Sequence, residues 1–216
     1  MPTYGETRTK FLRLLKRRDC SDALADDFLA DSVSRIQRVL RIPAGEKAVE
    51  VTVADVTYLD DENLPIPSDY LKLKDLTITN SEGGDRRTLV RKPLAEVQHY
   101  AEWGAQGCTK FYARRGATWI VGPLPLAGDV IRVDYYSEYE SFDTDATETI
   151  LLDIADDLVI YGALSYACDN FTDKRGPAFE GRFTQILSDL QAQADDDELS
   201  GNSAVQQGFS YPEDVL

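Results

Sequence analysis

The stretch IQRVLRIPAGEKAVEVTV, residues 36–53, contains the change of pattern that decides the fold. Up to Leu40 the apolar residues recur at the spacing of a helix face. The proline at 43 and the glycine at 45 then end the helical pattern. From residue 48 onward apolar and polar residues alternate, which places three valines (Val49, Val51 and Val53) on one face of a half-buried strand. This stretch therefore marks the junction of a helical segment with a β segment.

Two helices are expected before this junction. Residues 6–17 carry an apolar stripe between basic side chains. Ser21 can cap a second helix, because its hydroxyl can accept a hydrogen bond from a free N–H of the first turn.

Residues 45–140 are expected to be rich in strands. Alternation recurs at 70–79, 111–114, 118–121 and 130–136. The loop 81–85 predicts a hairpin whose return strand is 86–91, and a short helix is expected from Pro93 to Trp103.

A second change of period follows Ser141. Residues 143–147 are expected to cap a long helix whose buried stripe includes Ile150, Ile154 and Leu158. A last helix is expected to start at Gly176-Pro177, with Phe183 on its buried face.

The order of these elements predicts an α+β fold. Neither helix pair can bury its apolar stripe alone, so we expect the N-terminal pair (1–44) and the C-terminal pair (141–198) to form one helical bundle. An antiparallel β-rich domain (45–140) is inserted between them. Residues 199–216, polar at first, are expected to form a flexible, extended C-terminal arm.

Charge is distributed unevenly along the 216 residues, whose net charge is −15. Residues 1–18 hold six bases and one acid, whereas 143–198 hold fourteen acids and three bases. The charges are interpreted either as solvated faces or as complementary surfaces that meet partners or further copies of the chain. The excess of acids argues against general nucleic-acid binding, which depends on neutralising phosphates. The basic pairs at 86–87 and 91–92, together with the basic, aromatic stretch 110–115, have the composition of a platform for single-stranded nucleic acid. A strand with one solvent-exposed face has the same pattern.

No catalytic or metal-binding pattern stands out. His99 is the only histidine, and the three cysteines (Cys20, Cys108 and Cys168) are far apart, so neither a zinc site nor a disulfide framework is expected. Adjacent acids, as at 156–157 and 195–198, point to different faces of a helix and are interpreted as solvating charge. We therefore expect no enzyme and no cofactor. No apolar run approaches the ~20 residues of a membrane span, and the polar first ten residues predict no secretory signal.

An ordered set of segments resembles the head-to-tail connector adaptors, or head completion proteins, of tailed bacteriophages. The set comprises Thr7-x-x-x-Phe11-Leu12, an acid-rich second helix, LPIPSDYL at 64–71, WIVGPLP at 119–125, the strand 130–136, LVIYGAL at 158–164 and a closing helix around Phe183 and Leu190.

This resemblance implies a structural virion protein at the head–tail interface, made in the host cytoplasm. Such adaptors form a ring, commonly of twelve copies, which joins the portal protein to the next tail, stopper or nozzle component. The ring extends the channel through which DNA passes without specific binding.

The resemblance also implies site residues. C-terminal segments of such adaptors dock on the portal, which indicates the apolar residues of the arm and their proline: Phe209, Tyr211, Pro212, Val215 and Leu216. An acidic lumen repels DNA, so the acidic helices are expected to line the channel through Asp153, Asp156, Asp157 and Asp189. The alternatives are a non-enzymatic protein-binding scaffold of another class and, third, a carboxylate-dependent hydrolase.

Overall fold

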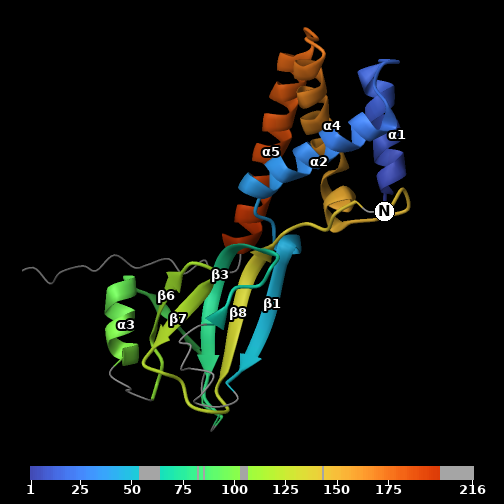
Figure 1. The fold of residues 1–216 in the computed structure, drawn as a ribbon. Helices are drawn as coiled ribbons and strands as arrows, with labels where there is room; N and C mark the ends of the chain where they lie inside the picture. The colour runs from blue at the N-terminus through green and yellow to red at the C-terminus, as the bar shows by residue number, and fades with distance from the viewer. Residues whose placement is uncertain (54–63, 82, 85, 103–106, 143, 200–216) are drawn as a thin grey trace, which may run out of the picture.

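The computed structural model describes residues 1–53, 64–81, 83–84, 86–102, 107–142 and 144–199. Four long helices form one part of the molecule and a β-rich part lies beside it, as Figure 1 shows. The helices are α1 (Tyr4–Leu15), α2 (Asp22–Val39), α4 (Ile150–Asn170) and α5 (Gly176–Leu199). The predicted α+β class is confirmed.

The β-rich part follows a single 3-10 turn at Pro43–Gly45 and contains two sheets of four strands each among the described residues. The first sheet has the order β1 (Glu46–Thr52), β8 (Val130–Ser137), β3 (Tyr70–Thr79) and β4 (Arg87–Thr88). The second has the order β2 (Leu64–Pro65), β7 (Thr118–Gly122), β6 (Phe111–Arg115) and β5 (Val90–Arg91). Helix α3 (Leu94–Glu102) packs against β6 and β7.

Strand β8 lies between β1 and β3 in the first sheet. Val133 lies opposite Val49 of β1 and Leu76 of β3 in antiparallel register. Ile131, Val133 and Tyr135 are all buried, so the predicted alternation is confirmed. Their side chains, together with Trp119 and Val121 of β7, form a core between the two sheets.

The expected return strand 86–91 is divided between the two sheets. β4 pairs antiparallel with β3, whereas β5 pairs in parallel with β6, so the β-rich part is not purely antiparallel. Leu89 explains the division, because its N–H donates to the Leu76 carbonyl while its side chain is buried between the sheets. The chain thus crosses from one sheet to the other at this residue.

A separate apolar core fills the helical part. Side chains from all four long helices contribute to it, including Phe11, Phe28, Leu158 and Phe183. Arg35 of α2 forms a two-pronged ion pair with Glu180 of α5, which also accepts a hydrogen bond from Ser165 of α4. Hydrogen bonding from Arg35 lowers the pKa of Glu180, against the effect of burial.

The prediction that residues 143–147 cap α4 is wrong, because the N-cap is Thr149. Of the segment 143–147, residue 143 lies outside the described residues, and the hydroxyl that caps the helix belongs to Thr149, which accepts from the N–H of Leu152. The carbonyls of Asp145 and Thr147 instead accept from the N–H groups of Gly5 and Tyr4. The segment therefore satisfies the free donors at the start of α1 rather than those of α4.

The buried stripe of α4 also starts differently from the expectation. Ile150 and Ile154 are 51% and 42% exposed, while Leu151 and Leu152 are buried. Ala155 has non-helical angles (φ −143°, ψ 40°), so the first turn of α4 is out of phase with the rest of the helix. Leu158 and its neighbour Val159 are buried as predicted, whereas Tyr161 and Ser165, expected farther along the stripe, are half-buried.

Candidate functional site

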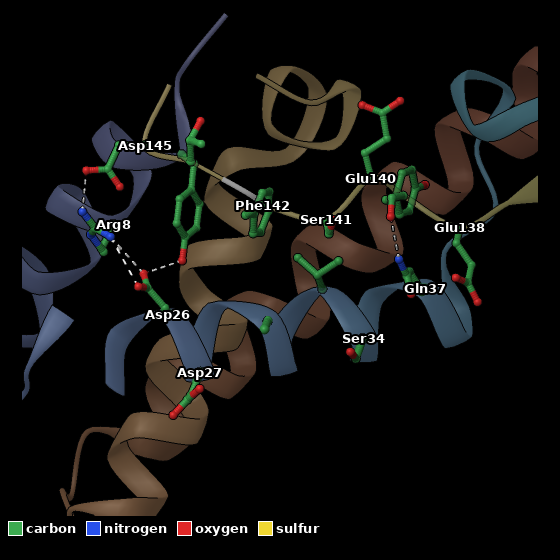
Figure 2. A pocket seen from close by; sticks show the side chains of 15 residues that line it. Arg8, Asp26, Asp27, Ser34, Gln37, Glu138, Glu140, Ser141, Phe142 and Asp145 are labelled. Carbon is green, nitrogen blue, oxygen red and sulfur yellow. Dashed lines mark hydrogen bonds and ion pairs between the residues drawn. The ribbon is translucent and has the colours of Figure 1, made fainter. Parts of the chain in front are cut away.

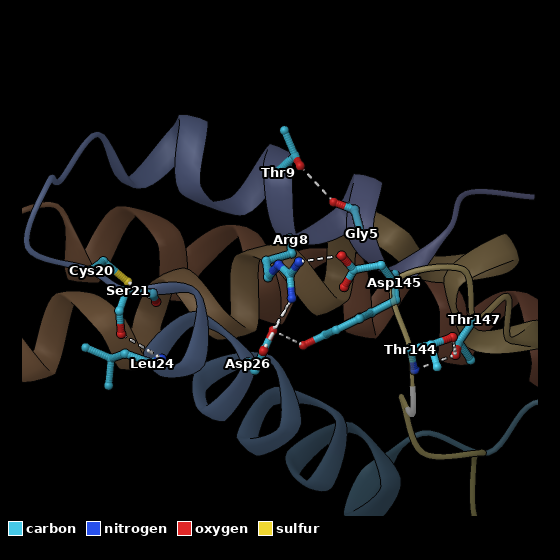
Figure 3. A network of polar contacts seen from close by, with 11 residues as sticks. Gly5, Arg8, Thr9, Cys20, Ser21, Leu24, Asp26, Thr144, Asp145 and Thr147 are labelled. Atoms are coloured by element: carbon cyan, nitrogen blue, oxygen red, sulfur yellow. Dashed lines mark hydrogen bonds and ion pairs between the residues drawn. The ribbon is translucent and has the colours of Figure 1, made fainter.

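A polar network joins the start of α1 to α2 and to the segment that leads into α4 (Figure 3). A capping box made by Thr3 and Glu6 fixes the first turn of α1, which places Arg8 on the side facing α2. The Arg8 guanidinium lies 3.2 Å from the Asp26 carboxylate and 2.8 Å from that of Asp145. One cation thus holds three segments together.

Tyr4 completes this network from the apolar side. Its hydroxyl donates to Asp26 over 2.5 Å, and its ring stacks on Phe142 with centroids 4.5 Å apart. Burial, and then the hydrogen bond to Asp26, raise the pKa of Tyr4 well above its usual value. The hydroxyl therefore stays protonated at neutral pH and remains a donor to Asp26.

A groove of about 530 Å³ opens beside this network, between α2 and residues 138–142 and 144–145 (Figure 2). Besides Asp26 and Asp145, three further carboxylates line it: Asp27, Glu138 and Glu140. None of these three lies within 4.0 Å of a cationic side chain in the described part of the chain. We call this hollow the acidic groove.

Asp156, one of the four acids expected to line a channel, has partners within the molecule. It accepts a hydrogen bond from the Thr7 hydroxyl at 2.9 Å and forms an ion pair with Lys10. Its side chain is only 18% exposed. Asp156 therefore attaches α1 to α4, and its charge is matched locally.

The other three candidate channel residues are exposed. Asp153 and Asp157 lie on the first half of α4, and Asp189 lies on α5. No ion pair joins any of them to a cation in the described residues. They are available to face a lumen.

The basic N-terminal segment and the acidic C-terminal part of the chain form contacts with each other within one molecule. Arg8 contacts Asp145, Lys10 contacts Asp156, and Arg175 donates to the carbonyls of Leu14 and Leu15. Both sequence-based interpretations of residues 1–18, a solvated face or a partner surface, missed this internal pairing.

Unpaired positive charge remains on the β-rich part. Four exposed bases lie on or next to β5 and β6, and we call them the basic edge: Arg91, Lys110, Arg114 and Arg115. Arg114 donates to the Gly116 carbonyl and lies over the Tyr70 ring, 5.5 Å from its centroid. None of the four bases forms an ion pair with a carboxylate that the structure describes.

The residues expected to bind the portal (Phe209, Tyr211, Pro212, Val215 and Leu216) lie outside the described residues. The hypothesis about them stays a prediction from the sequence.

The described residues form no metal site, no disulfide and no membrane-spanning helix. No three His, Cys, Asp or Glu side chains are grouped there in a way that suits a metal ion. The three cysteines are free, and His99 is exposed on α3. Among the same residues, we find no helix whose length and apolar character suit the crossing of a bilayer.

Sequence reasoning missed the acidic groove because its carboxylates are distant in the sequence. Asp27 is more than a hundred residues from Glu138, and only the packing of residues 138–142 along α2 brings them together. The basic edge was visible as a composition, but the pattern alone did not show that its charges are unpaired.

Comparison with known proteins gives one family. Residues 2–207 match the family described as SU10 adaptor protein, whereas no curated protein matches the chain. The match covers both the helical and the β-rich part. The chain therefore belongs to the SU10 adaptor protein family, a family of phage adaptors.

Proposed function

We propose that this protein is a virion component at the head–tail interface, where copies of it form a ring that joins the portal to the next tail component. The observation that carries the proposal is the match to a phage adaptor family over residues 2–207. Twelve copies is the expected number, by analogy with the connector adaptors that the sequence resembles. The role is structural rather than enzymatic.

The distribution of unpaired acids supports a channel role for part of the helical bundle. Asp153, Asp157 and Asp189 are exposed and lack an ion-pair partner in the described residues. Carboxylates on the wall of a channel repel the phosphates of passing DNA and so prevent binding. Asp156 is left out of this proposal, because Lys10 already neutralises its charge.

The experiment that tests the adaptor role is assembly with the portal protein of the same phage. We expect native mass spectrometry of the mixture to show a portal carrying a fixed number of adaptor copies, and electron microscopy to show one additional ring. A portal that gains no mass in the presence of excess adaptor contradicts the proposal.

The C-terminal arm provides a sharper test of how the portal is recognised. Residues 200–203 are polar, whereas Phe209, Tyr211, Val215 and Leu216 are apolar residues suited to a partner surface. Deletion of 204–216 is expected to leave the circular dichroism melt unchanged and to abolish portal binding. A matched control replaces residues 204–207 (Ala-Val-Gln-Gln) with Gly-Ser repeats and keeps Phe209, Tyr211, Val215 and Leu216. Portal binding that survives the deletion refutes the assignment.

A further inference from the structure

The acidic groove has the form of a receptor for a cationic surface. It is concave, with a volume of about 530 Å³, and aromatic and aliphatic side chains line it beside its carboxylates. Arg8 forms ion pairs with both Asp26 and Asp145, whereas Asp27, Glu138 and Glu140 have no cationic partner among the described residues. Figure 2 shows Asp27 on α2 and the two glutamates on the segment that runs along it.

The basic edge has the complementary properties. Its four cations lie on or next to β5 and β6, and β5 is the last strand in the order of the second sheet. A hollow of about 360 Å³ lies at this place, lined by Arg91, Lys92 and Arg114 among others. Lys92 pairs with Glu96, whereas Arg91 and Lys110 have no described carboxylate partner. Exposed cations without a carboxylate partner in their own molecule can meet complementary carboxylates of a second chain.

These two surfaces lie on opposite sides of the molecule. In Figure 1, α1 and the segment before α4 lie at the right, whereas α3, β6 and β7 lie at the left. The groove of one protein therefore cannot receive its own basic edge. Only a second copy can bring its basic edge to the groove.

We propose that the basic edge of one copy docks in the acidic groove of the next, in a repeated head-to-tail contact. Such a contact uses two different patches, and its repetition closes into a ring when the rotation between copies allows it. The inference rests on the proposed function, because it names the surfaces through which an adaptor ring is held.

Net charge favours a second copy over nucleic acid as the partner of the basic edge. Each copy carries −15, so copies repel one another wherever acids face acids. A basic patch placed against the groove of a neighbour replaces repulsion with attraction and fixes the orientation of the two copies. The three unpaired groove carboxylates fit this partner as well, whereas they repel DNA.

Charge reversal on each surface tests the contact. The edge variant carries Arg91→Glu and Lys110→Glu, and the groove variant carries Asp27→Lys and Glu140→Lys. Sedimentation of the purified protein at low ionic strength, and the number of copies bound per portal, are measured for each. We expect either variant to weaken self-association by about tenfold or more, because like charges then face each other. Mixing the two variants is expected to restore association, since the reversed surfaces match.

Two single reversals at exposed positions outside both surfaces serve as controls. Lys174→Glu lies in the turn before α5, and Asp169→Lys lies in the last turn of α4. Both are expected to associate like the wild type, and thermal melts verify that all variants fold.

The outcomes separate this contact from the adaptor role. Wild-type rings on the portal that are insensitive to both reversals overturn the contact and leave the adaptor role standing. Self-association that responds to the reversals without portal binding supports the contact and contradicts the adaptor role. The contact is also overturned if the edge variant changes only the binding of duplex DNA. Failure of the mixed edge and groove variants to associate overturns it as well.

Discussion

Gly162 lies where α4 crosses α2 and α5, and the crossing leaves no room for a side chain. A Cβ at this position overlaps the Ser32 hydroxyl and lies 3.0 Å from the Phe183 ring. Ser32 is itself held in place, because its hydroxyl donates to the Val159 carbonyl. The neighbours can therefore yield little, and the absence of a Cβ permits the close approach of the three helices.

Replacement of this glycine with alanine is expected to destabilise the protein despite the better helix propensity of alanine. Overpacking of a filled core costs about 1–3 kcal/mol of unfolding free energy. Gly181 of α5 is the matched control, because a Cβ there meets nothing within 4 Å. Gly181→Ala is expected to raise stability by about 0.5–1 kcal/mol. Urea unfolding of the two variants measures the difference, and equal effects contradict the packing argument.

Asp173 makes the junction between α1 and α5 sensitive to acid. Hydrogen bonds from the Arg175 side chain and N–H lower the pKa of Asp173 from 3.8 to about 2. Arg175, held by this carboxylate, donates to the carbonyls of Leu14 and Leu15 at the end of α1. Because the pKa is lowered in the folded state, the stabilisation is present above about pH 4 and is lost as the pH falls toward 2.

The variant Asp173→Asn is expected to melt at a lower temperature than the wild type at pH 6. The difference is expected to shrink as the pH approaches 2, where about half of the wild-type carboxyl is protonated. Asp169→Asn, four residues earlier and exposed, serves as the control substitution. Thermal melts from pH 6 to pH 2 measure the effect, and a gap that stays the same size over this range is the contrary result.

At the scale of the element, the start of α4 depends on one hydroxyl. Thr149 is buried and accepts from the N–H of Leu152, so its removal leaves that donor without a partner. Thr149→Ala is expected to cost about 1 kcal/mol, whereas Thr149→Ser keeps the acceptor and most of the stability. Chemical unfolding of both variants checks the claim. If serine behaves like alanine, lost packing of the methyl group, and not the cap, is the cause.

Elements with a regular pattern were predictable from the sequence. The alternation along 130–136 predicted β8 and its buried face. Ser21 was predicted as the cap of α2 because Asp22 follows it directly and apolar residues then recur at helical spacing. The N-cap of α4 was not predictable, since several residues able to cap a helix precede it. Only the contacts of Asp145 and Thr147 with α1 show that these two residues do not cap α4. The passage of the chain from the first sheet to the second at Leu89 could not be predicted either, because a short strand has no sequence pattern that shows which sheet it joins.

The acidic groove illustrates the same limit for a candidate site. The sequence drew attention to dense runs of acids in α4 and α5, yet one of these acids, Asp156, is paired with Lys10. The acids of the groove are scattered along the chain, in α2 and in the segment before α4. Their significance depends on which cations lie nearby, and that is decided by packing between distant segments.

At the scale of the whole molecule, apolar side chains gather in distinct clusters. One cluster contains residues of α1, α2, α4 and α5, and a second contains residues of both sheets. A third, smaller cluster joins α3 to β6 and β7. Because no residue of the first cluster belongs to the others, we propose that the helical and the β-rich parts unfold with some independence.

Two core truncations, one in each part, test this independence. Phe183 is 1% exposed in the helical core and Ile78 is 1% exposed between the sheets. Phe183→Ala is expected to cost about 3–5 kcal/mol and Ile78→Ala about 2–5 kcal/mol. Hydrogen exchange measured peptide by peptide is expected to speed up in α1, α2, α4 and α5 for the first variant, and in β1, β3 and β8 for the second. The local loss of packing lowers the opening free energy only of the unit that shares the core. Exchange that rises throughout the chain in both variants means that the two parts unfold together. Tyr139, which follows β8 and whose carbonyl accepts a hydrogen bond from the Gln37 side chain of α2, is then a place where they are coupled.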